Sequence, residues 1–325
     1  MHSSTREMAR QGAWIPASVA LMANLLQLAG VYWDVGWHHA WRRDTFWSPP
    51  HLAIYAGVAL AMAAAAMGSL AARTRQGRSP SPARGRDYRI AGLGPAIQIA
   101  AAPIDELWHR VIGPDVSVWS PPHLLGILGG LLGVLGWMLV LASPYGVEVS
   151  DGLVRALLFA FAVLLLTGSL FALGEYDHDP AVRGPWLYPA MAGLLAPWVL
   201  VAARNWLGWA RGGTLVTIGY TVLRLALVAG VWGMGLPWLG VPPVVVVGAL
   251  LLDGLPKRRG AGMAGAIFGL AFTLSDYPLT SFLSGRAWTI LEWAGTLSAA
   301  AAAGWASARL GSTLSASSRS RREAE

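Results

Sequence analysis

The sequence W-S-P-P-H-L at residues 47–52 is repeated without change at residues 119–124. An Asp followed four residues later by a His precedes each copy, as Asp34 and His38 before the first and Asp105 and His109 before the second. The separation between the two copies is the same, to within one position, for the Asp, the His and the WSPPHL string. So constant an offset indicates an internal repeat.

Each repeat predicts a hairpin of two helices. Ser followed by two prolines is typical of a helix start, with Ser at the N-cap and Pro in the first turn. Ser48 and Ser120 are therefore expected N-caps, and His51 and His123 should lie in the first turns. An Asp and a His four residues apart share one helix face. The His that begins one helix can therefore face the Asp/His pair that ends the helix before it.

Each hairpin brings together two imidazoles and a carboxylate, which suffice to hold one transition metal with coordination positions left open. A lone His within a membrane often only hydrogen-bonds between helices, and a carboxylate near the membrane surface can simply be solvated. The repetition of the whole pattern favours metal binding over these interpretations. The predicted ligands are Asp34, His38, His51, Asp105, His109 and His123. Residues expected to support them are Asp44, Glu106 and Asp115. His39 points elsewhere on its helix, and no catalytic residue can be named.

The composition is that of an integral membrane protein. Of the 325 residues, 55% are hydrophobic and only 13% are charged, whereas soluble domains carry about a quarter charged residues. The absence of Cys excludes thiolate metal sites, thiol nucleophiles and disulfides. The net charge of +7 lies mostly in Arg-rich loops, which indicates membrane orientation and no nucleic-acid partner.

The expected fold is an all-α, polytopic bundle of about ten transmembrane helices in a lipid bilayer. A helix needs about 20 apolar residues to cross a membrane. The apolar segments are 14–33, 51–72, 90–112, 123–142, 153–173, 186–203, 214–236, 241–254, 261–283 and 286–308. The short segment 241–254 is expected to be re-entrant or tilted. Residues 1–142 form the predicted metal-binding unit of four helices, and 143–325 a further transmembrane region of unknown role.

Arginines orient this bundle. Segment 73–89 carries six arginines, and placing it in the cytoplasm puts the other clusters of Arg and Lys there too. The predicted location is the bacterial inner membrane, with both termini in the cytoplasm and both metal sites toward the periplasm.

Other polar residues receive weaker predictions. The cluster Glu175, Asp177 and His178 is expected to be a solvated loop. Asp276 and Glu292 lie in apolar segments, where they could pair with Arg286 or Arg224 or line a path for protons or substrate. Asp253 is expected to mark a helix end.

Residues 37–55, W-H-H-A-W-R-R-D-T-F-W-S-P-P-H-L-A-I-Y, resemble the C subunit of the copper-containing membrane monooxygenases, the particulate methane and ammonia monooxygenases. That family carries W-H-x4-R-D-T followed by F-x-P-x-H. Its first copper site has the spacing D-x3-H-x12-H, which Asp34, His38 and His51 reproduce. Its second site has the spacing N-x3-H-x13-H, matched by Asp105, His109 and His123 with Asp in place of Asn.

The resemblance covers residues 30–140, about a third of the chain. It implies a copper-dependent monooxygenase component that oxidises a small apolar substrate or ammonia with O2. It also implies an electron donor such as a quinol, and further subunits or a homo-oligomer as partners. The spans after residue 143 have no counterpart in the family.

Two other classes of function fit the same residues. Zinc held by His and Asp could activate water in a membrane hydrolase. Alternatively, the two triads could be successive stations in a metal transporter or copper-delivery protein. Two His and a carboxylate also suit non-haem iron. The identity of the metal separates the hydrolase from the monooxygenase, whereas a transporter should show polar residues running through the spans to the cytoplasmic side.

Overall fold

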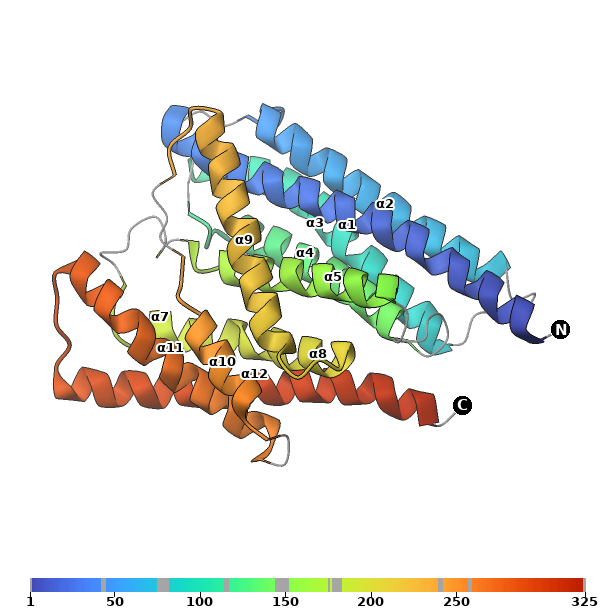
Figure 1. Ribbon diagram of the computed structural model, residues 1–325. Coiled ribbons are helices and arrows are strands. Elements are labelled where there is room, and N and C mark those ends of the chain that lie inside the picture. The colour runs from blue at the N-terminus through green and yellow to red at the C-terminus, as the bar shows by residue number, and fades with distance from the viewer. Residues whose placement is uncertain are drawn as a thin grey trace. The chain divides into compact units, whose positions relative to one another are not determined.

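The computed structural model describes residues 2–41, 45–74, 82–113, 117–143, 152–174, 176, 183–238, 242–256 and 259–323. In these ranges the regular secondary structure is entirely helical, which confirms the predicted fold class (Figure 1). The chain divides into two compact units. Unit 1 comprises residues 1–168, 225–237 and 321–325, and unit 2 comprises residues 169–224 and 238–320. The functional division at residue 142 remains a prediction.

Unit 1 contains the two repeated hairpins. Helix α1 (His2–Trp41) packs along α2 (Pro49–Thr74), and α3 (Pro82–Val111) packs along α4 (Pro121–Ala142). Helix α5 (Gly152–Phe171) follows and lies mostly in this unit. Successive helices of the first four run in opposite directions, so both Asp/His helix ends and both WSPPHL turns lie at the same end of unit 1 (Figure 1).

Glycines let the helices of each hairpin approach closely. A Cβ on Gly57 of α2 would lie 2.5 Å from Cγ of Gln27 on α1. On α3, a Cβ at Gly94 would lie 2.3 Å from the backbone nitrogen of Gly133 on α4. Gly94 thus touches α4 backbone to backbone, which is the type of packing that small residues permit in membranes.

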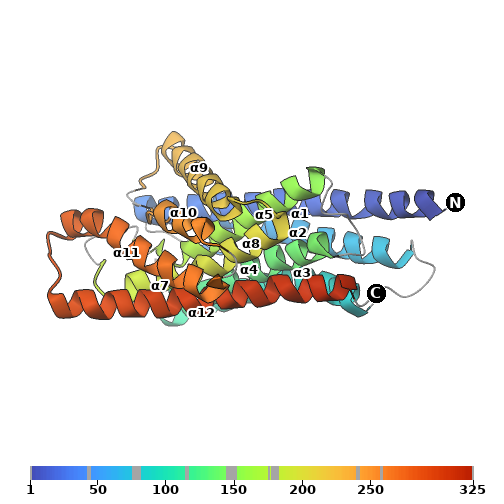
Figure 2. The same ribbon diagram turned by 60° about the horizontal axis from the view of Figure 1, so that its bottom comes forward.

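Unit 2 contains the remaining helices (Figure 2). These are α7 (Leu187–Leu195), α8 (Pro197–Leu207), α9 (Gly212–Gly233, whose last turns belong to unit 1), α10 (Val246–Gly254), α11 (Ala261–Ser284) and α12 (Ile290–Glu323). Pro197 interrupts the helix formed by α7 and α8, because proline cannot donate the backbone hydrogen bond that a continuous helix needs. Helix α11 packs closely on α12, since a Cβ on Gly265 would lie 1.9 Å from the carbonyl oxygen of Gly304.

In the described part of the chain, seven helical stretches are long and apolar enough to cross a membrane, so the chain is a polytopic membrane protein. They are Trp14–Trp41, Pro49–Arg73, Pro121–Ala142, Gly152–Phe171, Leu187–Leu207, Gly212–Gly233 and Ala261–Ser284. The other three predicted segments are helical but are not among these spans. Helix α3 carries several charged side chains, α12 is rich in small and polar residues, and α10 has only nine residues. At 1.5 Å per residue, α10 is about 14 Å long, less than half of a bilayer's hydrocarbon thickness.

Unit 2 holds a buried ion pair that the sequence did not predict. Nη1 of Arg183 lies 3.8 Å from Oδ2 of Asp276, and both side chains are almost fully buried. The carboxylate of Asp276 also accepts hydrogen bonds from the backbone N–H of Val244 (3.1 Å) and the hydroxyl of Thr280 (2.7 Å). Asp276 therefore fixes the extended segment before α10 to the middle of α11. Its partner is Arg183, not Arg224 or Arg286.

Glu292 and Asp253 each make more contacts than their sequence positions predicted. Glu292 pairs with Arg286, as predicted, and forms a reciprocal cap with Thr289 at the start of α12. Asp253 does end α10, but its carboxylate is buried. It accepts hydrogen bonds from the backbone and hydroxyl of Thr214 and lies 3.8 Å from Nη1 of Arg204.

Candidate metal centre

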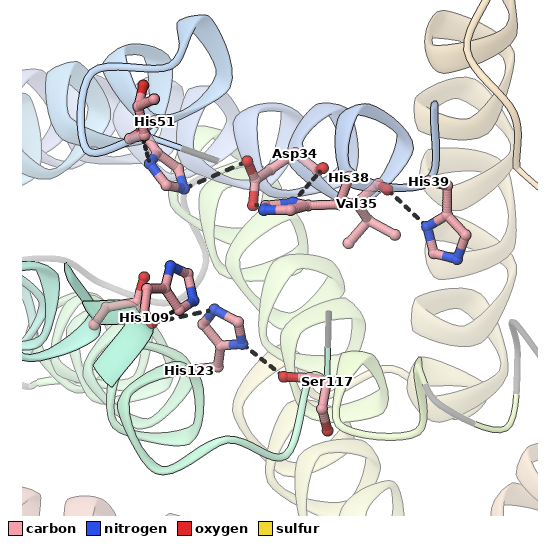
Figure 3. Close-up of polar contacts among 10 residues, drawn as sticks. Asp34, Val35, His38, His39, His51, His109, Ser117 and His123 are labelled. Carbon is pink, nitrogen blue, oxygen red and sulfur yellow. Dashed lines mark hydrogen bonds and ion pairs between the residues drawn. The ribbon is translucent and has the colours of Figure 1, made fainter. Parts of the chain in front are cut away.

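The second hairpin gathers Asp105, His109 and His123 into one cluster. Each of these residues offers a ligand atom, and the three atoms lie within 4.8 Å of one another. Asp105 and His109 come from the last two turns of α3, and His123 comes from the first turn of α4. Ser120 is the N-cap of α4, as predicted, although its hydroxyl makes no capping hydrogen bond. The two prolines after it turn the chain so that His123 faces back toward α3 (Figure 3).

One contact within this cluster has the length expected of two ligands that share an ion, and a second is slightly longer. Oδ1 of Asp105 lies 3.3 Å from Nε2 of His123 and 3.8 Å from Nε2 of His109. Strong hydrogen bonds between charged groups are shorter, at about 2.7–2.9 Å. Two ligands bound tetrahedrally to one ion at about 2.0–2.2 Å lie roughly 3.4 Å apart. The donor set therefore fits a transition metal that bridges the three side chains.

A backbone carbonyl orients His123. Its Nδ1 donates a hydrogen bond to the carbonyl oxygen of Ser117, at 2.6 Å (Figure 3). A proton on Nδ1 leaves the lone pair on Nε2, the nitrogen that faces Asp105. Metal-binding histidines are commonly oriented in this way by a carbonyl or carboxylate on the second nitrogen.

The first hairpin repeats this arrangement for its helix-start histidine. Nδ1 of His51 donates to the carbonyl oxygen of Thr45 at 3.0 Å, and Nε2 of His51 lies 3.4 Å from Oδ1 of Asp34 (Figure 3). Thr45 and Ser117 occupy equivalent positions of the repeat, since each precedes its histidine by the same interval. The sequence alone did not identify either residue, because a backbone carbonyl is present in every residue type. Their place in the repeat was the available signal.

The two triads differ at the other histidine. Nδ1 of His38 donates to the backbone carbonyl of Asp34, its own previous turn, at 2.9 Å, and lies 3.4 Å from Oδ2 of Asp34. The first triad consequently falls short of the close three-ligand cluster, and among the described residues only the second forms one. With its proton on Nδ1, His38 presents the lone pair of Nε2 to a metal.

Of the three residues predicted to support the ligands, the structure describes only Glu106. Glu106 forms an ion pair with Arg110, one turn further along α3, at 2.7 Å, and so points its charge at an arginine instead of at a ligand. Asp44 and Asp115 lie outside the described residues, as do Glu175, Asp177 and His178. His39 is exposed and donates to the carbonyl oxygen of Val35, away from Asp34, as predicted.

Burial makes both triads electrostatically strong sites for cations. The carboxylates of Asp34 and Asp105 are about 15% and 16% exposed. A charge removed from water interacts more strongly with a nearby opposite charge, because the effective dielectric constant falls. Each triad, with one anionic carboxylate beside two imidazoles, therefore favours the binding of a divalent cation.

Comparison with known proteins assigns no family. No family model matches the chain, and neither a curated protein nor a solved structure matches it. The functional argument consequently depends on the geometry and chemistry of the triads.

Proposed function

We propose that the chain is the metal-binding component of a copper-dependent membrane monooxygenase. The observation that carries the proposal is the close cluster of Asp105, His109 and His123, whose residue types recur at the equivalent positions of the first hairpin. The sequence resemblance to the C subunit of the copper-containing monooxygenases supports the same function.

Asp105, His109 and His123 would hold one copper ion, and Asp34, His38 and His51 a second. Copper bound there supplies the one-electron chemistry that activates O2 for insertion into a C–H or N–H bond, with electrons from a donor such as a quinol. The chain's own residues bind and orient. The carbonyl of Ser117 fixes the His123 ring, and Asp105 contributes the negative charge that offsets part of the metal's charge.

Three ligands leave coordination positions open, which a metal held only for structure does not need. Helix α4, which supplies His123, is long and apolar enough to span a membrane, so the site would lie within reach of a substrate dissolved in the bilayer. These two properties favour oxidation of a small apolar molecule. The same proposal includes ammonia as an alternative substrate and additional subunits as partners. It also places the protein in the bacterial inner membrane, with the metal sites toward the periplasm.

The experiment is metal analysis of protein purified into lipid nanodiscs and reconstituted in turn with copper, iron and zinc. We expect copper to be retained after dialysis and to give an electron paramagnetic resonance spectrum with nitrogen coupling from imidazole. His109→Ala and His123→Ala should each remove the signal of the second site. Retention of zinc alone, with hydrolysis of ester or amide substrates, would replace the proposal with a membrane hydrolase.

Activity provides the second test. Copper-loaded protein with a reduced quinol should consume O2 in the presence of a short alkane or ammonia, and the His123→Ala variant should not. Retained copper that moves across the membrane of a sealed vesicle, with no consumption of O2, would instead indicate a metal transporter.

A further inference from the structure

The two hairpins differ most in the turn of helix next to their histidines. Three residues after His51, α2 carries Ile54, and at the equivalent position after His123, α4 carries Gly126. One turn further, Val58 on α2 corresponds to Gly130 on α4. Positions three and seven residues after the histidine share its helix face. The second hairpin therefore lacks the two large side chains that the first carries along that face.

In the first hairpin this position is filled. Cγ1 of Ile54 lies only 2.8 Å from where a Cβ on Gly30 of α1 would be, so Ile54 occupies the layer between the helices, directly below the triad. Gly30 lies four residues before Asp34, on the same face of α1. The side chain of Ile54 thereby closes the helix interface beneath His51 and Asp34.

In the second hairpin the same position is open. A Cβ on Gly126 would meet no heavy atom within 4 Å. Ala101, which corresponds to Gly30, adds only a methyl group from α3. The next layer is closed again, because Nε2 of Gln98 lies 3.2 Å from a Cβ on Gly130. The open space is therefore confined to about one helical turn, between the triad and Gln98.

The exposure of the two histidines agrees with this difference. The side chain of His123 is 29% exposed, whereas that of His51 is 10% exposed. Ile104, one helical turn after Ala101 on the facing helix, is also well exposed. The exposed Ile104 and the apolar sequence of α4 make the surroundings of the opening apolar.

We propose that a small apolar substrate lies in the space beside Gly126, against the second triad. In the first hairpin, the side chain of Ile54 fills the equivalent position and prevents a substrate from binding there. The argument depends on the proposed function for the role of the triad, but the space itself does not require a metal. The glycines alone would not assign a site. A site is assigned because the cluster of Asp105, His109 and His123 lies at one end of the space. In addition, His123 is more exposed than His51.

Xenon tests the space directly, because it binds small apolar sites from which water is excluded. We would determine structures of the full chain, without added metal, under xenon pressure for the wild type and three variants. Gly126→Ile fills the space and should fold well, since a Cβ there meets nothing and helices disfavour glycine. Gly230→Ile is the matched control, a helical glycine of α9 that is also surrounded by open space. Ile54→Gly transfers the opening to the first hairpin.

We expect xenon beside Gly126 in the wild type and in Gly230→Ile, its loss in Gly126→Ile, and a new xenon atom beside His51 in Ile54→Gly. Xenon absent from the wild type, a lipid chain occupying the position, or xenon unchanged in Gly126→Ile would overturn the inference. These outcomes are separate from the fate of the proposed function. A chain that holds no copper can still bind xenon there, and a chain that holds copper can fail to.

A second measurement connects the space to the metal. Nitric oxide, a small apolar probe, should perturb the copper signal of the second site more readily than that of the first. Gly126→Ile should suppress this response at unchanged copper content. An equal response of both sites in the wild type would contradict the inference.

Discussion

Oδ1 of Asp105 lies 3.3 Å from Nε2 of His123, and the equivalent atoms of Asp34 and His51 are 3.4 Å apart. In both hairpins the histidine that begins one helix thus meets the carboxylate that ends the previous helix. The agreement between two separate segments of the chain indicates that this contact is the common core of the repeat, around which the other ligands vary.

Asp105 should determine the affinity of the second site. Asn keeps a ligand oxygen but removes the negative charge, which counts for more in a low-dielectric setting. Asp105→Asn should therefore lower the affinity without removing the metal, and Asp105→Ala should lower it further because only two histidines remain. The measurement is bound copper against free copper concentration. We also expect the wild-type second site to bind at least as tightly as the first. Wild-type binding by Asp105→Ala would show that Asp105 is no ligand.

His38 and His39 form a matched pair of neighbours. His39 is rotated about 100° from His38 around the helix, and donates to Val35 instead of approaching Asp34. His38→Ala should reduce copper content at the first site, whereas His39→Ala should leave it unchanged. Copper per chain, measured after dialysis of each variant, distinguishes the two. Equal losses would mean that the ligand assignment is wrong.

The buried ion pair of Arg183 and Asp276 should stabilise unit 2 only when both partners are present. Removal of one partner leaves a charge buried without compensation, which typically costs about 3–5 kcal/mol. Arg183→Met should therefore lower the thermal unfolding temperature markedly, and Arg183→Met combined with Asp276→Leu should recover part of the loss. The control is Arg286→Met. Its pair with Glu292 is largely exposed on the arginine side, so a much smaller shift is expected. A single variant as stable as the wild type would contradict this role.

The sequence predicted the helical membrane class, and it named the three residues that the structure gathers in the second hairpin. Apolar runs are long and charges are few, and an exact repeat with Ser-Pro-Pro helix starts fixes which histidines face which carboxylates. Seven of the ten predicted segments meet the length and apolarity of a span. Segment 241–254 shows why counting apolar segments overestimates the number of spans, since its proline-rich start leaves only nine residues for α10.

Contacts that depend on distant packing could not be predicted in this way. Arg183 and Asp276 are far apart in the sequence, and nothing in the local pattern of either residue names the other. The orientation of His38 toward its own backbone carbonyl is also a matter of rotamer, which sequence spacing does not determine. The contrast of Ile54 with Gly126 was present in the repeat, but its meaning required the position of Gly30 on the facing helix.

The close contact of α3 with α4 should be necessary for the second metal site, because Asp105 and His109 come from one helix and His123 from the other. A Cβ on Gly94 would lie 2.3–2.5 Å from the backbone of Gly133 and Gly129, so Gly94→Ala must push the helices apart. Overpacking of this kind typically costs about 1–3 kcal/mol. We expect Gly94→Ala to lower both the thermal stability and the copper affinity of the second site, and to leave the first site less affected. Gly92→Ala is the matched control, since its Cβ would make only an ordinary 3.7 Å contact with Ala65. Copper titration of both variants, with the two sites separated by their resonance spectra, decides the matter. Unchanged affinity in Gly94→Ala would mean that the ligands adjust to the helix separation, and that the triad does not depend on this packing.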